Sequence, residues 1–234
     1  MIVRLLLAAL AAGLIAGMAM TPAQYVKTIP LIMQAEAYEN GEAGHAHDAA
    51  EAGAAHEHAE DSMLGFGRFW DTVLANLVAG AGFALMLAAV ALIMGVELPA
   101  GREAIMRGLL LGAGAWFCVQ LAPSLSLPPA VPGFPYADLG DRQSWWMITV
   151  AASAVGLWCL VMRPEWVLKV LGLVIIVAPH LWGSPVPEDL ASEVPAYIAS
   201  AYAAASLATT LFFWLLLGGL LGYFLSRVPE EAAA

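Results

Sequence analysis

Charged residues are scarce in this sequence: only 12% of its 234 residues are Asp, Glu, Lys or Arg, whereas 61% are hydrophobic. This composition lies outside the range of soluble domains and is typical of polytopic membrane proteins. Basic residues are the scarcest charged type, nine against nineteen acidic ones, which gives a net charge of −10. Binding of nucleic acid requires a basic surface, so we exclude a nucleic-acid partner and expect the chain to attract cations.

Cysteines and catalytic motifs are equally scarce. Cys118 and Cys159 are the two cysteines, and both fall inside apolar runs near opposite faces of the membrane in the topology that the charges predict. We therefore expect no disulfide between them. The sequence has no Gly-rich phosphate loop ending in lysine, no His-Glu-x-x-His and no Gly-x-Ser-x-Gly. We predict that the chain is not an enzyme, does not hydrolyse ATP and carries no cofactor.

Long apolar runs dominate the sequence. A helix needs roughly 20 apolar residues to cross a hydrocarbon core of about 30 Å. Six runs approach that length: residues 2–20, 72–96, 105–122, 144–162, 166–182 and 197–225. The first run is longer than a signal-peptide core and lacks a clear cleavage site, so we interpret it as a retained helix. We predict an all-α polytopic membrane protein, a single membrane domain over residues 1–234 with about six transmembrane helices.

The loop charges predict the orientation of these helices. With the N-terminus in the cytoplasm, six of the nine Lys and Arg residues lie on the inner side, as the positive-inside rule requires. Fourteen of the nineteen acidic residues then lie on the outer side. Such a surface raises the local concentration of cations, an effect that salt weakens. We predict a bacterial inner (cell) membrane protein with both termini inside and an acidic outer face.

Histidine is almost confined to residues 33–68, which hold four of the five histidines and eight carboxylates. Few of these residues could form a core, so we expect a flexible loop outside the membrane. The histidines form two His-x-His pairs, His45/His47 and His56/His58. Imidazoles bind borderline divalent transition metals, and carboxylates can complete the shell. We predict that the loop captures a metal ion; the alternative is a low-complexity loop that only solvates the surface.

The fifth histidine, His180, follows Pro179 near the outer end of the fifth run. An ionisable residue in a membrane segment is a functional hypothesis by default. Pro179 also lacks the N–H that would bind a carbonyl one turn earlier. Glu188 and Asp189 follow closely and could supply oxygen ligands. We therefore add His180, Glu188 and Asp189 to the predicted metal ligands; the alternatives are an interfacial histidine bonded to a loop and a solvated acidic loop.

Proline steps mark the outer ends of the three outward-going runs, at Pro22, Pro123 and Pro179. We expect the helices to end there. The recurrence fits three similar helical hairpins, but it also fits the general enrichment of proline near the ends of membrane helices.

Four segments of the chain match one family: the N-terminal RLLLAALAAGLIAGMAMTPAQ, the His-rich segment, PGFPYADLGDRQSWW and APHLWGSP. Over nearly its full length the chain resembles the predicted cobalt transporter subunit family CbtA. The resemblance implies a membrane component of a cobalt uptake system that serves vitamin B12 synthesis. It also implies a small one-helix partner, CbtB, with a histidine-rich tail. The family is usually described with five crossings, one fewer than the six counted here.

Together these features predict the membrane subunit of a divalent metal uptake system. Co2+ is the expected transported ion, and Ni2+ and Zn2+ would also suit the ligands. The outer loop would capture the ion and the outer helix ends would pass it inward. The alternative is a non-transporting membrane metal sensor or metal-delivery scaffold. The expected partners are the lipid bilayer, the metal ion and a small CbtB-like subunit, and assembly of several copies of the chain stays open.

Overall fold

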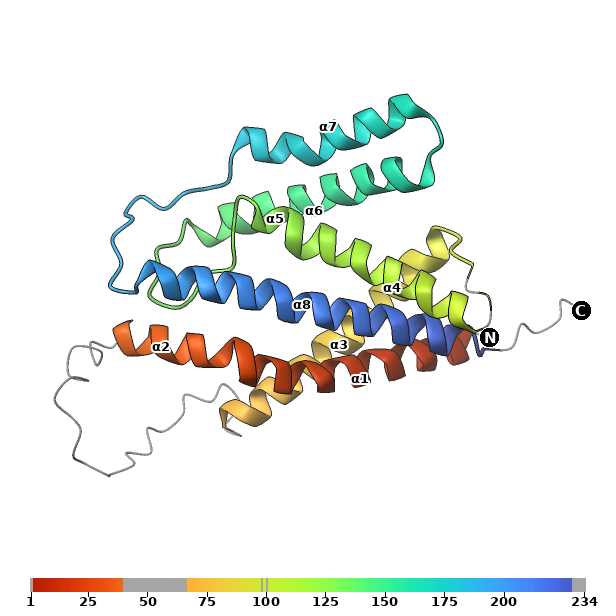
Figure 1. Ribbon diagram of the computed structural model, residues 1–234, viewed down its shortest axis with the longest axis horizontal. Coiled ribbons are helices and arrows are strands. Elements are labelled where there is room, and N and C mark those ends of the chain that lie inside the picture. The colour runs from red at the N-terminus through yellow and green to blue at the C-terminus, as the bar shows by residue number, and fades with distance from the viewer. Residues whose placement is uncertain (1, 40–66, 98, 100, 229–234) are drawn as a thin grey trace, which may run out of the picture. The chain divides into compact units, whose positions relative to one another are not determined.

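The computed structural model of the protein describes residues 2–39, 67–97, 99 and 101–228 (Figure 1). All regular structure in these ranges is helical, which confirms the predicted all-α class. The elements are α1 (Ile2–Lys27), α2 (Ile29–Glu39), α3 (Arg68–Ile93), α4 (Arg102–Trp116), the π-helical turn η2 (Phe117–Leu121), α5 (Ala122–Ser124), α6 (Leu139–Met162), α7 (Trp166–Trp182) and α8 (Ala196–Leu225).

Five helical segments of the described residues are long and apolar enough to cross a membrane: Ile2–Lys27, Arg68–Ile93, Arg102–Ser124, Leu139–Met162 and Ala196–Leu225. The protein is therefore a polytopic membrane protein. The remaining predicted crossing corresponds to α7, a shorter apolar helix of 17 residues. At 1.5 Å per residue such a helix is about 25 Å long, somewhat less than a hydrocarbon core of about 30 Å. Trp166 and Trp182 stand at its two ends, where aromatic residues anchor membrane helices.

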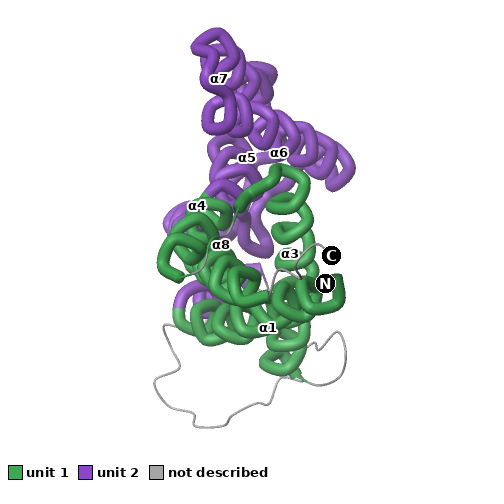
Figure 2. Tube along the Cα trace, turned by 90° about the vertical axis from the view of Figure 1, so that its right-hand side faces the viewer, with its two compact units in different colours: residues 1–26, 43–113, 211–234 green, residues 27–42, 114–210 purple. Residues whose placement is uncertain are grey.

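The chain divides into two compact units (Figure 2). Unit 1 comprises Met1–Val26, Ala43–Ala113 and Leu211–Ala234, and unit 2 comprises Lys27–Glu42 and Gly114–Thr210. The prediction that the whole chain forms a single membrane domain stays a prediction.

Glycines bring the helices of unit 1 into backbone contact. Gly13 of α1 lies against the carbonyl of Gly80 in α3, and Gly108 of α4 lies against the carbonyl of Gly218 in α8. Any Cβ at these four positions would collide with the facing backbone. Helices in lipid associate through such close packing because no hydrophobic effect drives them together. Asn76 of α3 adds a polar link, since its amide donates to Thr21 Oγ1 at 3.0 Å and Gln24 Oε1 at 2.7 Å, both in α1.

The helices run through their prolines, so the prediction that they end at the proline steps is wrong. α1 continues past Pro22 to Lys27, α7 continues past Pro179 to Trp182, and the helical segment that begins at Arg102 passes Pro123 and ends at Ser124. A proline removes one backbone hydrogen bond, and the turns on either side of it still hold the helix. At Pro123 a side chain replaces the lost donor, because Trp146 Nε1 donates to the Val119 carbonyl at 3.2 Å.

In unit 2, α6 and α7 form an antiparallel hairpin in which the two helices lie side by side (Figure 1). Gly156 of α6 and Gly172 of α7 meet backbone to backbone. At the far end of the hairpin, the segment after α7 returns to the loop that precedes α6, where Ser184 Oγ donates to the Ser126 carbonyl at 2.7 Å. α7 therefore carries the chain back to the end of the hairpin at which α6 begins.

Helix α2 occupies residues that we expected to be loop. Residues 33–39 form its last turns, and Ala35 packs in a buried cluster with Val131, Val194 and Ile198. The expectation rested on local composition, which favours a loop. The apolar partners of Ala35 come from segments about 100 residues or more along the chain, so composition could not reveal them.

Candidate functional site

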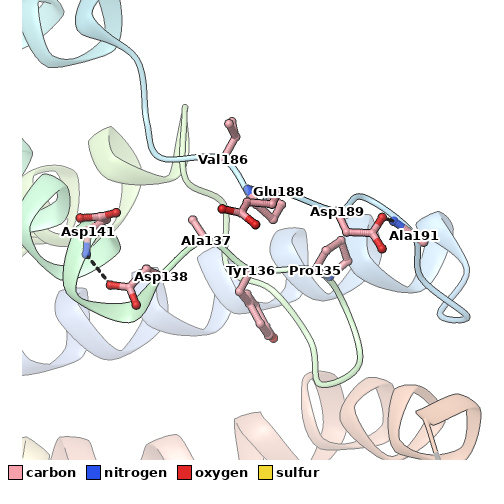
Figure 3. A pocket seen from close by; sticks show the side chains of 10 residues that line it. Pro135, Tyr136, Ala137, Asp138, Asp141, Val186, Glu188, Asp189 and Ala191 are labelled. Atoms are coloured by element: carbon pink, nitrogen blue, oxygen red, sulfur yellow. Dashed lines mark hydrogen bonds between the residues drawn. The ribbon is translucent and has the colours of Figure 1, made fainter.

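Four carboxylates line one hollow of unit 2 (Figure 3). Asp138 and Asp141 come from the start of α6, and Glu188 and Asp189 come from the segment that follows α7. The hollow has a volume of about 560 Å³, and Tyr136 lies on its wall between the two acidic pairs. The α6–α7 hairpin brings the pairs together because it returns the chain to the side from which α6 departs.

Local hydrogen bonds fix two of these carboxylates, those of Asp138 and Asp189. Asp138 caps α6, since its Oδ1 accepts from the backbone N–H groups of Gly140 at 2.8 Å and Asp141 at 3.3 Å. Asp141 lies in the first turn, where the helix dipole favours a negative charge. Asp189 Oδ1 accepts from the N–H of Ala191 at 2.9 Å. Asp138 and Asp189 are thus held at the hollow by hydrogen bonds to the backbone of the turns that carry them.

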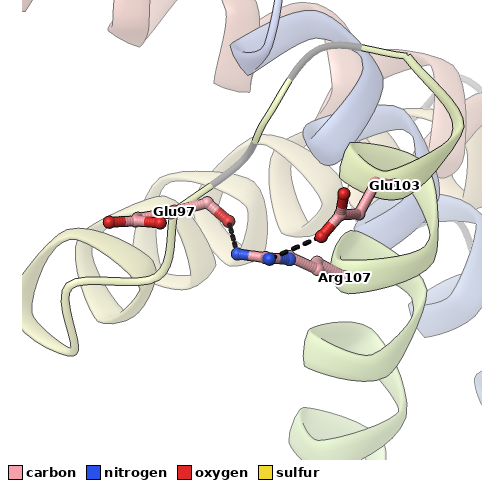
Figure 4. A network of polar contacts seen from close by, with 3 residues as sticks. All are labelled: Glu97, Glu103 and Arg107. Carbon is pink, nitrogen blue, oxygen red and sulfur yellow. Dashed lines mark hydrogen bonds and ion pairs between the residues drawn. The ribbon is translucent and has the colours of Figure 1, made fainter.

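The charge of the hollow is not balanced by its own wall, because none of the described residues that line it is basic. A second polar network, in unit 1, shows the opposite arrangement (Figure 4). There Arg107 donates to the Glu97 carbonyl at 2.8 Å and pairs with the Glu103 carboxylate at 2.5 Å, so the carboxylate has a cationic partner. The hollow therefore has an excess of negative charge and enough volume for a ligand. A surface with an excess of negative charge attracts cations.

The hollow is not a chelating site in this structure. Within the described ranges, no three His, Cys, Asp or Glu side chains come close enough to hold one metal ion directly. A hydrated divalent cation does not need such a cluster, because its bound waters can donate hydrogen bonds to separate carboxylates. The geometry therefore suits the concentration and loose holding of a hydrated cation.

His180 lies in the last turn of α7, partly buried between a hydroxyl group and an aromatic ring. Its Nδ1 is 2.8 Å from Ser126 Oγ, and its ring meets the Trp145 ring edge to face with centroids 5.8 Å apart. The other ring nitrogen, Nε2, is buried and has no hydrogen-bond partner among the described residues. One imidazole nitrogen is therefore occupied by a hydroxyl and the other is unused.

The structure separates the predicted ligands into two places. Glu188 and Asp189 line the hollow with Asp138 and Asp141, whereas His180 is not part of its wall. The sequence prediction counted Asp138 and Asp141 among the outer acids but did not place them in the site. The tight turn at residues 163–165 could have predicted this arrangement. Two helices joined by a short turn run antiparallel, so the start of the first helix and the end of the second lie close together. The ligand roles of His180, Glu188 and Asp189 stay predictions.

The histidines of the predicted capture loop, His45, His47, His56 and His58, lie outside the described residues, so their metal binding also stays a prediction. The residue that precedes this part of the chain is described. Glu39, at the end of α2, lies against Gly133, where an added Cβ would be 3.2 Å from Glu39 Cβ. Gly133 adopts a φ of 69°, in the region that favours glycine, and stands two residues before Pro135 on the wall of the hollow.

Comparison with known proteins identifies the family. Residues 2–226 match the family described as "Probable cobalt transporter subunit (CbtA)". No curated protein and no solved structure matches the chain. The matched range includes the five candidate membrane spans of the described residues and all four carboxylates of the hollow. The match confirms the resemblance that the sequence motifs indicated. The chain therefore belongs to the CbtA family of probable cobalt transporter subunits.

Proposed function

We propose that this protein is the membrane subunit through which Co2+ enters a bacterial cell for vitamin B12 synthesis, and that the acidic hollow collects the ion. Four carboxylates around one hollow, without a basic side chain on its wall, carry this proposal. A transporter whose substrate is dilute gains from a surface that raises the local concentration of that substrate. The family description supports cobalt as the ion, and the four carboxylates of the hollow support a place that would hold a cation.

The proposed orientation puts both termini in the cytoplasm and the hollow outside. The distribution of Lys and Arg supports it through the positive-inside rule. The return of α7 along α6 is consistent with both termini on one side, since α7 as a sixth crossing would make the number of crossings even. The hollow then opens toward the side from which the ion arrives.

The proposed transport route has three successive binding sites. His45, His47, His56 and His58 gather the ion in the segment that follows Glu39. Glu39, the last described residue before that segment, lies against Gly133 in the loop that leads to Pro135 on the wall of the hollow, and this contact supports the first step of the route. From the hollow the ion passes to His180 Nε2, the unused nitrogen in the last turn of α7. Because Nε2 is buried, transfer to it requires movement of the groups around it.

The family description as a subunit implies further subunits of the transporter. We propose that one of them is a small one-helix protein with its own histidine-rich tail, similar to CbtB. The absence of a phosphate-binding loop in this sequence means that any energy from ATP would come from another component.

Neutralising the hollow is expected to weaken capture of cobalt without slowing saturated transport. In the triple variant Asp141→Asn, Glu188→Gln and Asp189→Asn, we expect the half-saturating Co2+ concentration of uptake to rise by about three- to ten-fold, because the local excess of the ion is lost. The difference should shrink as ionic strength increases. Asp138 is retained because it caps α6.

The matched control is Glu165→Gln, which removes one exposed carboxylate at the other end of the α6–α7 hairpin. It should leave the half-saturating concentration unchanged. The proposal is contradicted if the triple variant has the wild-type half-saturating concentration at low ionic strength.

A further inference from the structure

Arg142 occupies an unusual position beside the hollow. It lies in the first turn of α6, four residues after Asp138, at a spacing that commonly allows an ion pair. The N-terminus of a helix is also unfavourable for a cation. Among the described residues, however, Arg142 forms no ion pair, and its guanidinium carbon instead lies 4.6 Å from the centre of the Tyr136 ring.

The Tyr136 side chain is anchored through its hydroxyl group. Its hydroxyl donates to the carbonyl of Val131, which is fully buried in the cluster with Val194 and Ile198. Burial raises the pKa of Tyr136 above its usual value, and Arg142 opposes this shift only in part. The phenol therefore stays neutral and keeps the proton that it donates to Val131. The Tyr136 ring, which contacts the Arg142 guanidinium, is thus anchored to the buried cluster of unit 2 that contains Val131.

We propose that Tyr136 is a positioning residue for cation capture: its ring holds the Arg142 guanidinium out of ion-pair distance of the four carboxylates, so that none of them is paired with it. The inference rests on the proposed capture of Co2+ by the hollow. At a protein surface, a cation–π contact and an ion pair have similar strengths. Removing the ring would therefore leave Arg142 free to pair with Asp138 or its neighbours. The hollow would lose charge and would present a competing cation to Co2+.

The test is a rescue experiment on cobalt uptake by the complete transporter. Tyr136→Leu is expected to raise the half-saturating Co2+ concentration by about three- to ten-fold with little change in the maximum rate. Tyr136→Phe keeps the ring and should remain close to wild type. The double variant Tyr136→Leu with Arg142→Gln should return to the wild-type value, because no guanidinium is left to occupy the hollow. A merely structural defect at Tyr136 would not be repaired by removing Arg142.

Two further variants complete the design. Trp158→Leu removes the ring from the other cation–π pair of unit 2, in which Arg163 lies 5.3 Å from the ring centre, and it should not change the half-saturating concentration. Arg142→Lys leaves Tyr136 in place, so it tests the inference even if Tyr136→Leu fails to fold. Lysine stacks on a ring less well than arginine and acts as a point charge. We therefore expect it to turn to the carboxylates and to raise the half-saturating concentration.

The inference is overturned if Arg142→Gln does not rescue Tyr136→Leu, if Tyr136→Phe is as impaired as Tyr136→Leu, or if Arg142→Lys has no effect. Its failure can be told apart from failure of the proposed function. If the triple acid variant raises the half-saturating concentration and Tyr136→Leu does not, only the role of Tyr136 is wrong. If the triple acid variant itself has no effect, the hollow does not capture cobalt and both are wrong.

Discussion

Valine in place of Gly108 is expected to leave little folded protein in the membrane. A Cβ at Gly108 would be directed at the carbonyl of Gly218 and would lie 3.1 Å from Gly222 Cα, so every nearby atom belongs to the backbone of α8. A flexible side chain could move aside, but a helix backbone cannot do so without separation of the pair. Because helices in lipid associate through close packing, the loss of this contact removes the main attraction between α4 and α8.

The control for this prediction is Gly82→Val in α3, in the same unit. A Cβ at Gly82 meets nothing within 4 Å, and the change in helix propensity is the same. The amount of monodisperse protein after detergent extraction, measured by size-exclusion chromatography, should fall at least about five-fold for Gly108→Val. Gly82→Val should resemble wild type. Equal yields of the two variants would show that the α4–α8 contact is not needed for folding.

Alanine in place of His180 is expected to reduce the maximum rate of cobalt uptake by at least about ten-fold, since even the outer-shell partners of a metal ligand are worth that much. The half-saturating concentration should change less, because the hollow that captures the ion does not include His180. The triple acid variant is expected to show the opposite pattern, with a higher half-saturating concentration and an unchanged maximum rate. It would place His180 after the hollow on the route of the ion.

Ser126→Ala is the matched control for His180, since it removes the hydroxyl at 2.8 Å from Nδ1 and keeps the imidazole. Its effect on the maximum rate should be smaller than that of His180→Ala. Cobalt uptake that is unchanged by His180→Ala at every concentration would remove this residue from the transport route. The histidine would then be a structural link between α7 and the loop that holds Ser126.

Hydropathy predicted the helices of this protein well because lipid permits only structures that satisfy their own backbone. A run such as residues 197–225 has to be a helix if it lies in the membrane. The same pattern could not predict how the helices pair. Gly108 and Gly218 are far apart in the sequence, and each is one of 22 glycines, so composition does not reveal which two face each other.

The candidate site was predicted in part. Glu188 and Asp189 were expected to be ligands because they follow His180, but the structure places them with Asp138 and Asp141. Proximity in sequence was a poor guide here, because the chain after α7 brings Glu188 and Asp189 to a wall that they share with Asp138 and Asp141 and that does not include His180. The position of Arg142 on Tyr136 could not be predicted either, since its spacing from Asp138 favours an ion pair.

The most direct test of this account is accumulation of labelled Co2+ in right-side-out membrane vesicles that contain the complete transporter, with and without this chain. We predict cobalt inside the vesicles, protected from an external chelator and released by detergent, only when the chain is present. Replacement of His45, His47, His56 and His58 by alanine should lower this accumulation at low cobalt and leave it unchanged at saturation. If the chain binds cobalt that the external chelator removes completely, the protein is a metal sensor or delivery scaffold, and the proposal of transport is wrong.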